Sequence, residues 1–100
     1  MCKSRIFNEI MKAVSEETEV PADCILSNKK DEDTVDARYI LVHLLSKSGI
    51  SHTSIAKFIN KDVRTVNNIV IGFDARMRSR KMLGINLEQI KKVLGNSLFR

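Results

Sequence analysis

Four polar residues close together, Arg64, Thr65, Asn67 and Asn68, have side chains that can hydrogen-bond to DNA bases and phosphates. Arginine pairs with guanine O6 and N7 through two bonds, and asparagine pairs similarly with adenine N6 and N7. If Val66 points inward, a turn of about 100° per residue directs Arg64 and Asn68 nearly opposite to it, with Thr65 and Asn67 on their flanks. The spacing predicts a helix that presents these side chains to the major groove of DNA.

Two helices joined by a tight turn are expected to position these side chains. Apolar residues at helical spacing give each helix one buried face: Ile55, Ala56 and Ile59 in the first, and Val66, Ile69, Val70, Phe73 and Met77 in the second. Asn60 tolerates the left-handed conformation that ends a helix, and Asp62 is a suitable N-cap for the next. The pattern predicts a helix-turn-helix over about residues 51–81, whose second helix runs from Val63 to Lys81.

The same pattern has a second interpretation, as a module that contacts proteins and not DNA. Helix pairs that cross at a small residue are common in all-α domains, and the motif has false positives. Val63 and Ile71 are apolar at positions where a DNA-binding helix could be polar. The outward-facing Ile71 has three alternative roles: contact with a thymine methyl group, packing against the C-terminal tail, or a homodimer contact.

Basic residues are concentrated in the second half of the chain. The 100 residues have a net charge of +5. Residues 1–50 contain seven Lys/Arg and nine Asp/Glu, whereas residues 51–100 contain ten and three. Clustered positive charge is typical of proteins that bind a polyanion. A group at the end of the second helix, Arg76, Arg78, Arg80 and Lys81, could contact phosphate or simply stabilise the helix C-terminus.

The sequence has no pattern of catalytic, cofactor-binding or metal-binding residues, so we expect no enzyme activity. It lacks a glycine-rich phosphate loop, and Cys2 and Cys24 are not spaced with the histidines as zinc ligands. Both cysteines are expected to be free thiols. The longest apolar run, Tyr39 to Leu45, is too short to span a membrane. These features predict a cytoplasmic protein with no membrane partner.

The remaining segments predict more helices and no strand. With 43% hydrophobic residues and a single proline, the chain is expected to form one all-α domain of five or six helices over residues 1–100. The other expected helices are Ser4 (as cap) to Thr18, Pro21 to Cys24, Thr34 to Lys47, and an accessory helix over about residues 86–95. Gly84 should break the chain before an Asn86–Gln89 capping box, and Ser51 or Thr53 should cap the first helix of the pair. The run Tyr39–Leu45 should be central, with His43 packed and hydrogen-bonded.

Two stretches resemble the C-terminal DNA-binding domain of the bacterial replication initiator DnaA. The first is ADCILSNKKDEDTVDARYILVHLL, which directly follows Val20-Pro21. Within it, Ser27-Asn28-Lys29-Lys30 resembles the family's basic loop, and Arg38 precedes the apolar run. The second, Lys61-Asp62-Val63-Arg64-Thr65-Val66, is similar to the string that starts the family's recognition helix. The likeness spans roughly Ile6 to Met82. No counterpart of the initiator's ATPase domain is present, so we do not expect this chain to open an origin by using ATP.

This resemblance implies double-stranded DNA as the partner, in replication initiation or transcription control. The site residues it implies, together with the spacing, are Ser27, Asn28, Lys29, Lys30, Arg38, Ser51, His52, Thr53, Lys61, Asp62, Val63, Arg64, Thr65, Asn67 and Asn68. Lys29 and Lys30 would contact the backbone or minor groove, and Arg38 would hold phosphate with the helix capped near Ser51. Val63 stands where the family has histidine, so the sequence preference need not be shared. The alternative is a protein-interaction module or a small antagonist of an initiator.

Overall fold

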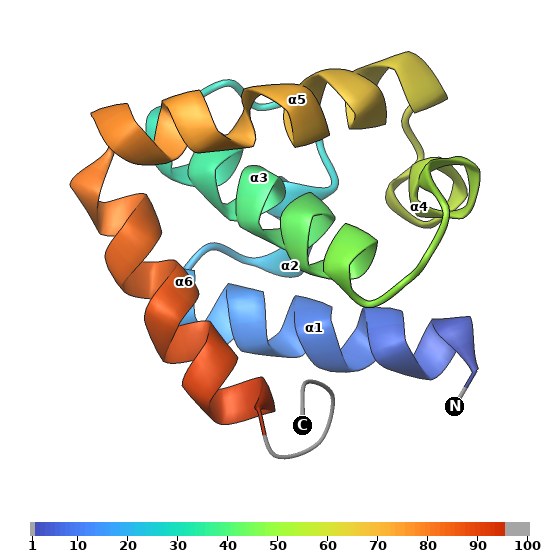
Figure 1. Ribbon diagram of the computed structural model, residues 1–100, viewed down its shortest axis with the longest axis horizontal. Coiled ribbons are helices and arrows are strands. Elements are labelled where there is room, and N and C mark those ends of the chain that lie inside the picture. The colour runs from blue at the N-terminus through green and yellow to red at the C-terminus, as the bar shows by residue number, and fades with distance from the viewer. Residues whose placement is uncertain (1, 96–100) are drawn as a thin grey trace.

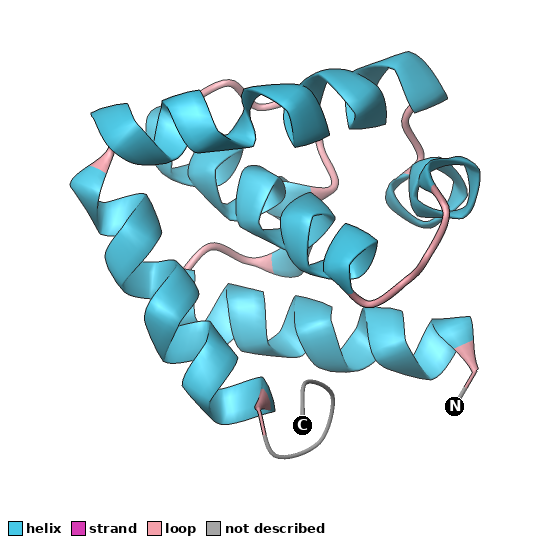
Figure 2. Ribbon diagram, in the orientation of Figure 1, coloured by secondary structure: helices cyan, strands magenta, loops and turns pink. Residues whose placement is uncertain are grey.

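The computed structural model describes residues 2–95, which form six helices and no strand, as the sequence predicts (Figures 1 and 2). They are α1 (Lys3–Thr18), α2 (Ala22–Ile25), α3 (Glu32–Lys47), α4 (His52–Ile59), α5 (Val63–Ser79) and α6 (Lys81–Leu94). Within this part of the chain, no helix is both long and apolar enough to cross a bilayer. Cys2 and Cys24 are free, as expected.

Helix α3 lies at the centre and contacts each of the other five helices. Figure 1 shows α1 on one side of it, α5 on the other, and α6 across one end. Its residues Ile40, Leu41, Val42, Leu44 and Leu45 are fully buried, which explains the apolar run. The helix begins at Glu32 and not at Thr34, because the Asp31 carboxylate accepts hydrogen bonds from the Thr34 N–H and hydroxyl and so acts as the N-cap.

His43, in the middle of α3, packs against α5 by aromatic stacking. Its ring lies parallel to that of Phe73, with 3.9 Å between the ring centroids. Burial, followed by the positive charges of Lys47 and Lys91, lowers the pKa of His43, while Asp74 acts in the opposite direction. The packing prediction is confirmed. Within residues 2–95 the ring forms no hydrogen bond, so that part of the prediction is wrong.

Helix α6 runs without interruption through Gly84 and Asn86, so the predicted break and the Asn86–Gln89 capping box are wrong. Leu83, Leu87, Ile90 and Leu94 form a buried stripe along the whole helix. A glycine inside a helix costs about 1 kcal/mol, which is less than burying even one leucine contributes. Local propensity is therefore outweighed by packing.

The predicted second helix is divided near its end, because α5 stops at Ser79. Arg80 adopts an extended conformation, and Lys81 already belongs to α6. Two smaller corrections concern the first half of the chain. Helix α1 begins one residue early, with Cys2 at the N-cap position, and Pro21 caps α2 and does not lie within it. A proline at this position sacrifices no hydrogen bond, since the N–H that it lacks would have no acceptor in the helix.

A buried carboxylate joins the end of α5 to the start of α3. Asp36 accepts a 2.7 Å bond from Nε of Arg76 and two bonds, of 2.9 and 2.8 Å, from Nε and Nη2 of Arg80. Arg80 also pairs with Glu32, and Arg76 lies over the ring of Tyr39. Two of the basic residues that could have contacted phosphate are thus engaged within the protein.

Candidate nucleic-acid interface

The turn between α4 and α5 has the geometry that its residues predict. Asn60 adopts a left-handed conformation with φ 56° and ψ 46°, and its backbone N–H bonds back to α4. Asp62 is the N-cap of α5 and accepts bonds of 2.8 and 2.9 Å from the N–H and hydroxyl of Thr65. These bonds, that of the backbone N–H first, lower the pKa of Asp62. The start of α5 is therefore fixed relative to α4.

The first two turns of α5 are exposed on the side away from the core. Val66 and Ile69 point inward and are buried, whereas Arg64 and Asn68 are exposed and have no hydrogen-bond partner among residues 2–95. Val63 is 42% exposed beside them. The predicted orientation of this helix is confirmed. Arg64 and Asn68 keep all their donors available to a ligand.

The other two predicted base-contacting residues, Thr65 and Asn67, form hydrogen bonds to other side chains of the protein at its surface. The Thr65 hydroxyl donates to the capping carboxylate of Asp62. Oδ1 of Asn67 lies 2.6 Å from Nδ1 of His52, in the first turn of α4. An amide oxygen only accepts, so this contact requires a proton on Nδ1 of His52 and leaves the Asn67 NH₂ group as the available donor. Asn67 is thereby held in one orientation.

Arg38 is almost fully buried beneath the basic loop and its donors bond to backbone carbonyls, which corrects the prediction that it holds phosphate. Its side chain donates to three backbone carbonyl oxygens, at 2.9 Å to Ile25, 2.8 Å to Ser27 and 3.3 Å to Lys29. The residue is only 6% exposed, and burial lowers the pKa of its guanidinium. An arginine can satisfy several carbonyls at once because its donors are arranged in a planar fork. Arg38 therefore sets the path of the loop.

Lys61 holds the same loop from the opposite side. Its Nζ donates bonds of 2.9 Å to the Ser27 carbonyl and 2.9 Å to Oδ1 of Asn28, with a longer one to Leu26. Burial, then the charges of Arg38 and Lys30, lowers the pKa of this amine. The structure thus brings together three predicted site residues, Ser27, Asn28 and Lys61. Their contacts with one another hold the loop in place.

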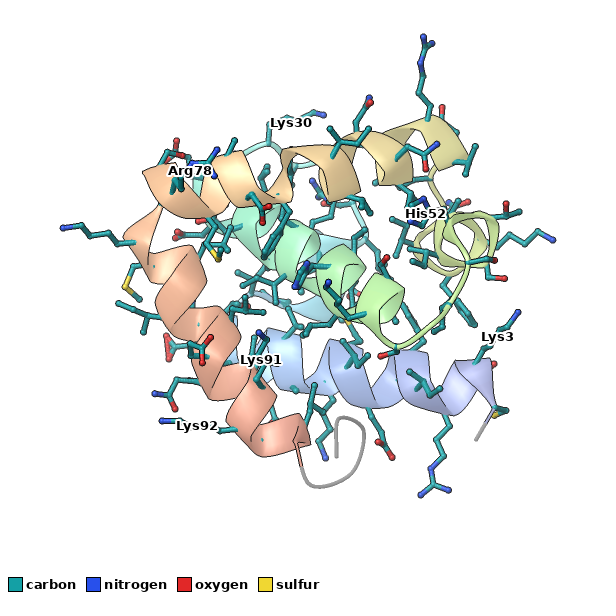
Figure 3. The ribbon with its side chains drawn as sticks, in the orientation of Figure 1. Lys3, Lys30, His52, Arg78, Lys91 and Lys92 are labelled. Carbon is teal, nitrogen blue, oxygen red and sulfur yellow. The ribbon has the colours of Figure 1, made fainter. Side chains whose placement is uncertain are left out.

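Lys29 and Lys30 occupy the tip of that loop with exposed side chains. Between the tip and α5 lies a cavity of about 340 Å³. It is lined by Asn28, Lys30, Val35, Arg38, Tyr39, Lys61, Thr65, Asn68 and Ile69. Figure 3 shows Lys30 and His52 on opposite sides of α5. The loop thus adds positive charge beside the exposed face of α5.

The N-terminus of α4 contributes a further basic position that the sequence did not reveal. Ser51 is the cap and accepts from the Ser54 N–H, while Thr53 is exposed. Nζ of Lys3, from α1, donates a 3.3 Å bond to the Ser54 hydroxyl. A helix N-terminus and an ammonium group both favour an anion. No local pattern could have identified Lys3, because it lies 51 residues away in sequence.

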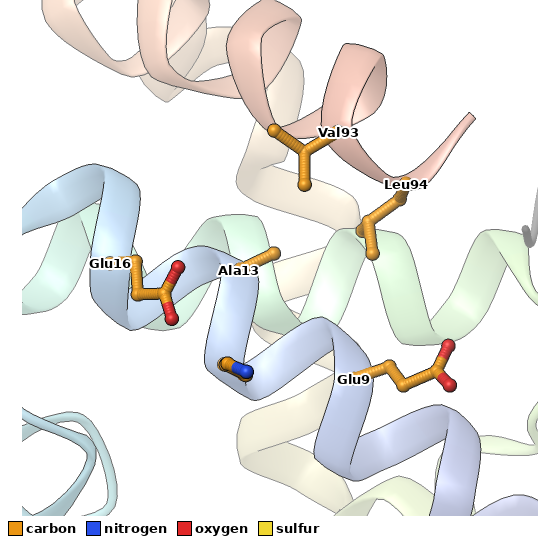
Figure 4. A pocket seen from close by; sticks show the side chains of 6 residues that line it. Glu9, Ala13, Glu16, Val93 and Leu94 are labelled. Atoms are coloured by element: carbon orange, nitrogen blue, oxygen red, sulfur yellow. The ribbon is translucent and has the colours of Figure 1, made fainter. Parts of the chain in front are cut away.

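Other concave regions offer less convincing sites. Glu9, Ala13 and Glu16 of α1 and Val93 and Leu94 of α6 line a cavity of about 330 Å³, together with Lys12 (Figure 4). Its acidic side chains would repel phosphate. Among residues 2–95, no group of His, Cys, Asp and Glu side chains is arranged to bind a metal ion.

Comparisons with known proteins do not place this chain in a family. No protein-family model matches it, and no curated protein matches its sequence.

Proposed function

We propose that this protein binds double-stranded DNA, with the first two turns of α5 in the major groove. The observation that carries the proposal is the pair of exposed side chains Arg64 and Asn68, which form no hydrogen bond within residues 2–95 and lie at the start of a helix fixed by its cap. Both residue types recognise bases through two parallel hydrogen bonds. A helix that follows a tight turn, entering the groove at its N-terminal end, is the docking mode of helix-turn-helix proteins.

Two basic groups would contact the DNA backbone on either side of this helix. Lys29 and Lys30 extend from the loop that Arg38 and Lys61 hold in place. On the other side, Lys3 and the N-terminus of α4 offer positive charge. Phosphate contacts of this kind position a protein on the duplex without specifying a sequence. His52, held against Asn67, would orient one further base-contacting amide.

The likeness to the DNA-binding domain of the initiator DnaA supports the same docking, because the basic loop and the start of α5 carry its two motifs. A role in replication initiation or in transcription control follows as part of the proposal. Val63 stands at the family's histidine position, so we expect a different preferred sequence. The protein would act without catalysis and without a cofactor.

The second candidate is a protein-interaction module, which the apolar surface of α5 favours. Ile71 is 81% exposed and Val63 is 42% exposed on this helix. Burying such side chains against a partner protein would be favourable. This module could act as an antagonist of a replication initiator.

Selection of duplexes from a random pool distinguishes the two candidates. A DNA-binding protein should enrich a short common sequence, and its affinity for that sequence should fall steeply with salt. A pool that shows no retention in low salt, where even non-specific binding is strong, would exclude DNA binding and leave the protein-interaction candidate.

A further inference from the structure

The outward face of α6 is exposed along its length. At about 100° per residue, the face opposite the buried stripe carries four exposed residues: Lys81, Ile85, Glu88 and Lys92. Ile85 is 53% exposed at the middle of this face. Figure 3 shows Lys92 on the outer side of the helix. An apolar residue flanked by charges is thus presented to solvent.

An open groove follows this face beside Gly84. It is lined by Lys81, Gly84, Ile85, Glu88 and Gln89. Since Gly84 has no side chain, the backbone of α6 can be approached closely at this point. Ile85 lies directly next to the gap, so the surface combines a projection with a recess.

The charges on this face are complementary to those of the same face on a second copy of the protein. Lys81 and Glu88 are two helical turns apart, and neither forms an ion pair with any residue in the range 2–95. When two identical helices pair antiparallel about a two-fold axis, each residue faces the one at the same distance beyond the axis. An axis between Gly84 and Ile85 places Lys81 opposite the partner's Glu88, and Glu88 opposite the partner's Lys81.

We propose that this face is a homodimer interface, in which α6 pairs antiparallel with α6 of a second copy. The axis that matches the charges also brings Ile85 to nearly the same level, and the same side of the contact, as the partner's Ile85, so the two exposed apolar side chains pack against each other. On the other side of the contact, the small Gly84 lets the two helices approach closely. Both complementarities come from one axis position. A different protein would need the same arrangement of charges and the same surface shape, which a second copy of α6 already has.

The contact is small, so the dimer should be weak and concentration-dependent. One helix pair buries less than the roughly 1,200 Å² of total area typical of stable complexes. Increasing salt should weaken the dimer, since its ion pairs are at the surface. The proposal is independent of DNA binding, because α6 lies apart from the exposed face of α5.

Sedimentation velocity of the protein without DNA, over a range of concentrations in low salt, tests the proposal. Lys81→Glu and Glu88→Lys should each weaken dimerisation by about tenfold or more, since each converts two attractive pairs into two repulsive ones. The double variant Lys81→Glu/Glu88→Lys restores opposite charges and should restore the dimer. Thermal melts of each variant establish that the monomer remains folded.

Lys92→Glu is the matched control, with the same charge change on the same face of the same helix. In the proposed register Lys92 lies beyond the pairing, so dimerisation should not weaken. An axis near residue 90 would instead pair Lys92 with the partner's Glu88. A dimer weakened by Lys92→Glu but not by Lys81→Glu would therefore overturn the proposed register. A wild-type protein that stays monomeric at every concentration, or a dimer whose double variant is not restored, overturns the proposal.

Discussion

Nζ of Lys61, in the turn between α4 and α5, donates a 2.9 Å hydrogen bond to the carbonyl oxygen of Ser27, 34 residues earlier. The same carbonyl accepts a 2.8 Å bond from Arg38. A cation from α3 and a cation from the turn between α4 and α5 therefore meet at one point of the backbone loop that leads to Lys29 and Lys30. The bonds of Lys61 to Ser27 and Asn28 tie this loop directly to the turn that precedes α5. The proposed backbone contact is thus positioned relative to the proposed base contact.

Lys30 and Arg38 should differ in how their removal affects the salt dependence of DNA binding. Lys30→Ala removes an exposed cation, so it should weaken binding to all duplexes and reduce the slope of log K against log salt by about one unit. Arg38→Met removes a buried cation that holds carbonyls. It should lower the free energy of unfolding by roughly 1–3 kcal/mol, because buried acceptors lose their donors.

Denaturant melts and binding titrations at several salt concentrations measure the two effects. Lys12→Ala, an exposed lysine of α1 outside the proposed interface, serves as the control and should change neither quantity. If Arg38→Met left stability intact and reduced the salt slope as Lys30→Ala does, Arg38 would be a direct phosphate contact after all.

Short-range chemistry explains which features could be predicted from the sequence. The left-handed Asn60 and the cap Asp62 depend on residues within one turn, and each is found where the pattern places it. Of the two caps expected for α4, Ser51 or Thr53, the structure has Ser51. The apolar faces of α4 and α5 follow from periodicity alone. Such features need no knowledge of the remaining chain.

Features that depend on distant segments were missed or misassigned. Arg38 resembled a surface cation, because nothing in its neighbourhood shows that the loop folds back over it. Lys3 reaches α4 only through the packing of α1. The weak helix propensity of glycine and asparagine predicts that the last helix starts at Asn86, whereas the buried leucine stripe extends it back to Lys81. Sequence patterns at one site contain no information about such contacts.

His43 should make the stability of the protein depend on pH in mildly acidic solution. Burial, Lys47 and Lys91 lower its pKa in the folded state, so below pH 6.5 the unfolded chain binds more protons than the folded one. The associated stability is fully present above the unfolded-state pKa of 6.5, and it declines as pH falls toward and below the lowered pKa of the folded state.

His43→Phe should remove this decline while keeping the stack on Phe73. Thermal melts between about pH 5 and 7 span the range in which a histidine titrates. His52→Gln is the matched control, and its stability should still decline because His43 is present. Asp31 and Asp62, whose pKa values are lowered, act in the same direction only at more acidic pH, below 3.8. An unchanged decline in His43→Phe would assign the effect to other groups.

Gly84→Ala should stabilise the monomer, because Gly84 lies inside a continuous helix. An alanine at this position meets only ordinary contact with Met77, whose Cγ would be 3.8 Å from the new Cβ. Replacing glycine by alanine in a helix interior contributes about 0.5–1 kcal/mol. Gly49→Ala is the contrasting control: Gly49 has φ of 90°, so the same substitution there should destabilise. Denaturant melts at low protein concentration, where α6 is unpaired, measure both. A loss of stability in Gly84→Ala would indicate a break in the helix at this residue.

Arg64 should determine the preferred DNA base at one position of the binding site. Its exposed side chain forms no hydrogen bond or ion pair among the described residues, and a bidentate contact with guanine discriminates against other bases by about 1–3 kcal/mol. Arg64→Ala should therefore relax the preference at one base pair, while non-specific binding in low salt falls only slightly. Arg78→Ala removes an exposed arginine from the other end of the same helix and should leave the preference unchanged.

The companion variant Val63→His introduces the residue that the initiator family carries at the start of its recognition helix. If this protein docks as that family does, the selected sequences should shift toward the family's site, because the new imidazole lies beside Arg64 at the end of α5 that enters the groove first. Selection from a random duplex pool measures all three variants in one experiment. Should the wild type, Arg64→Ala and Val63→His enrich the same sequences, α5 does not determine the preference, and its exposed Val63 and Ile71 are better explained as a surface for another protein.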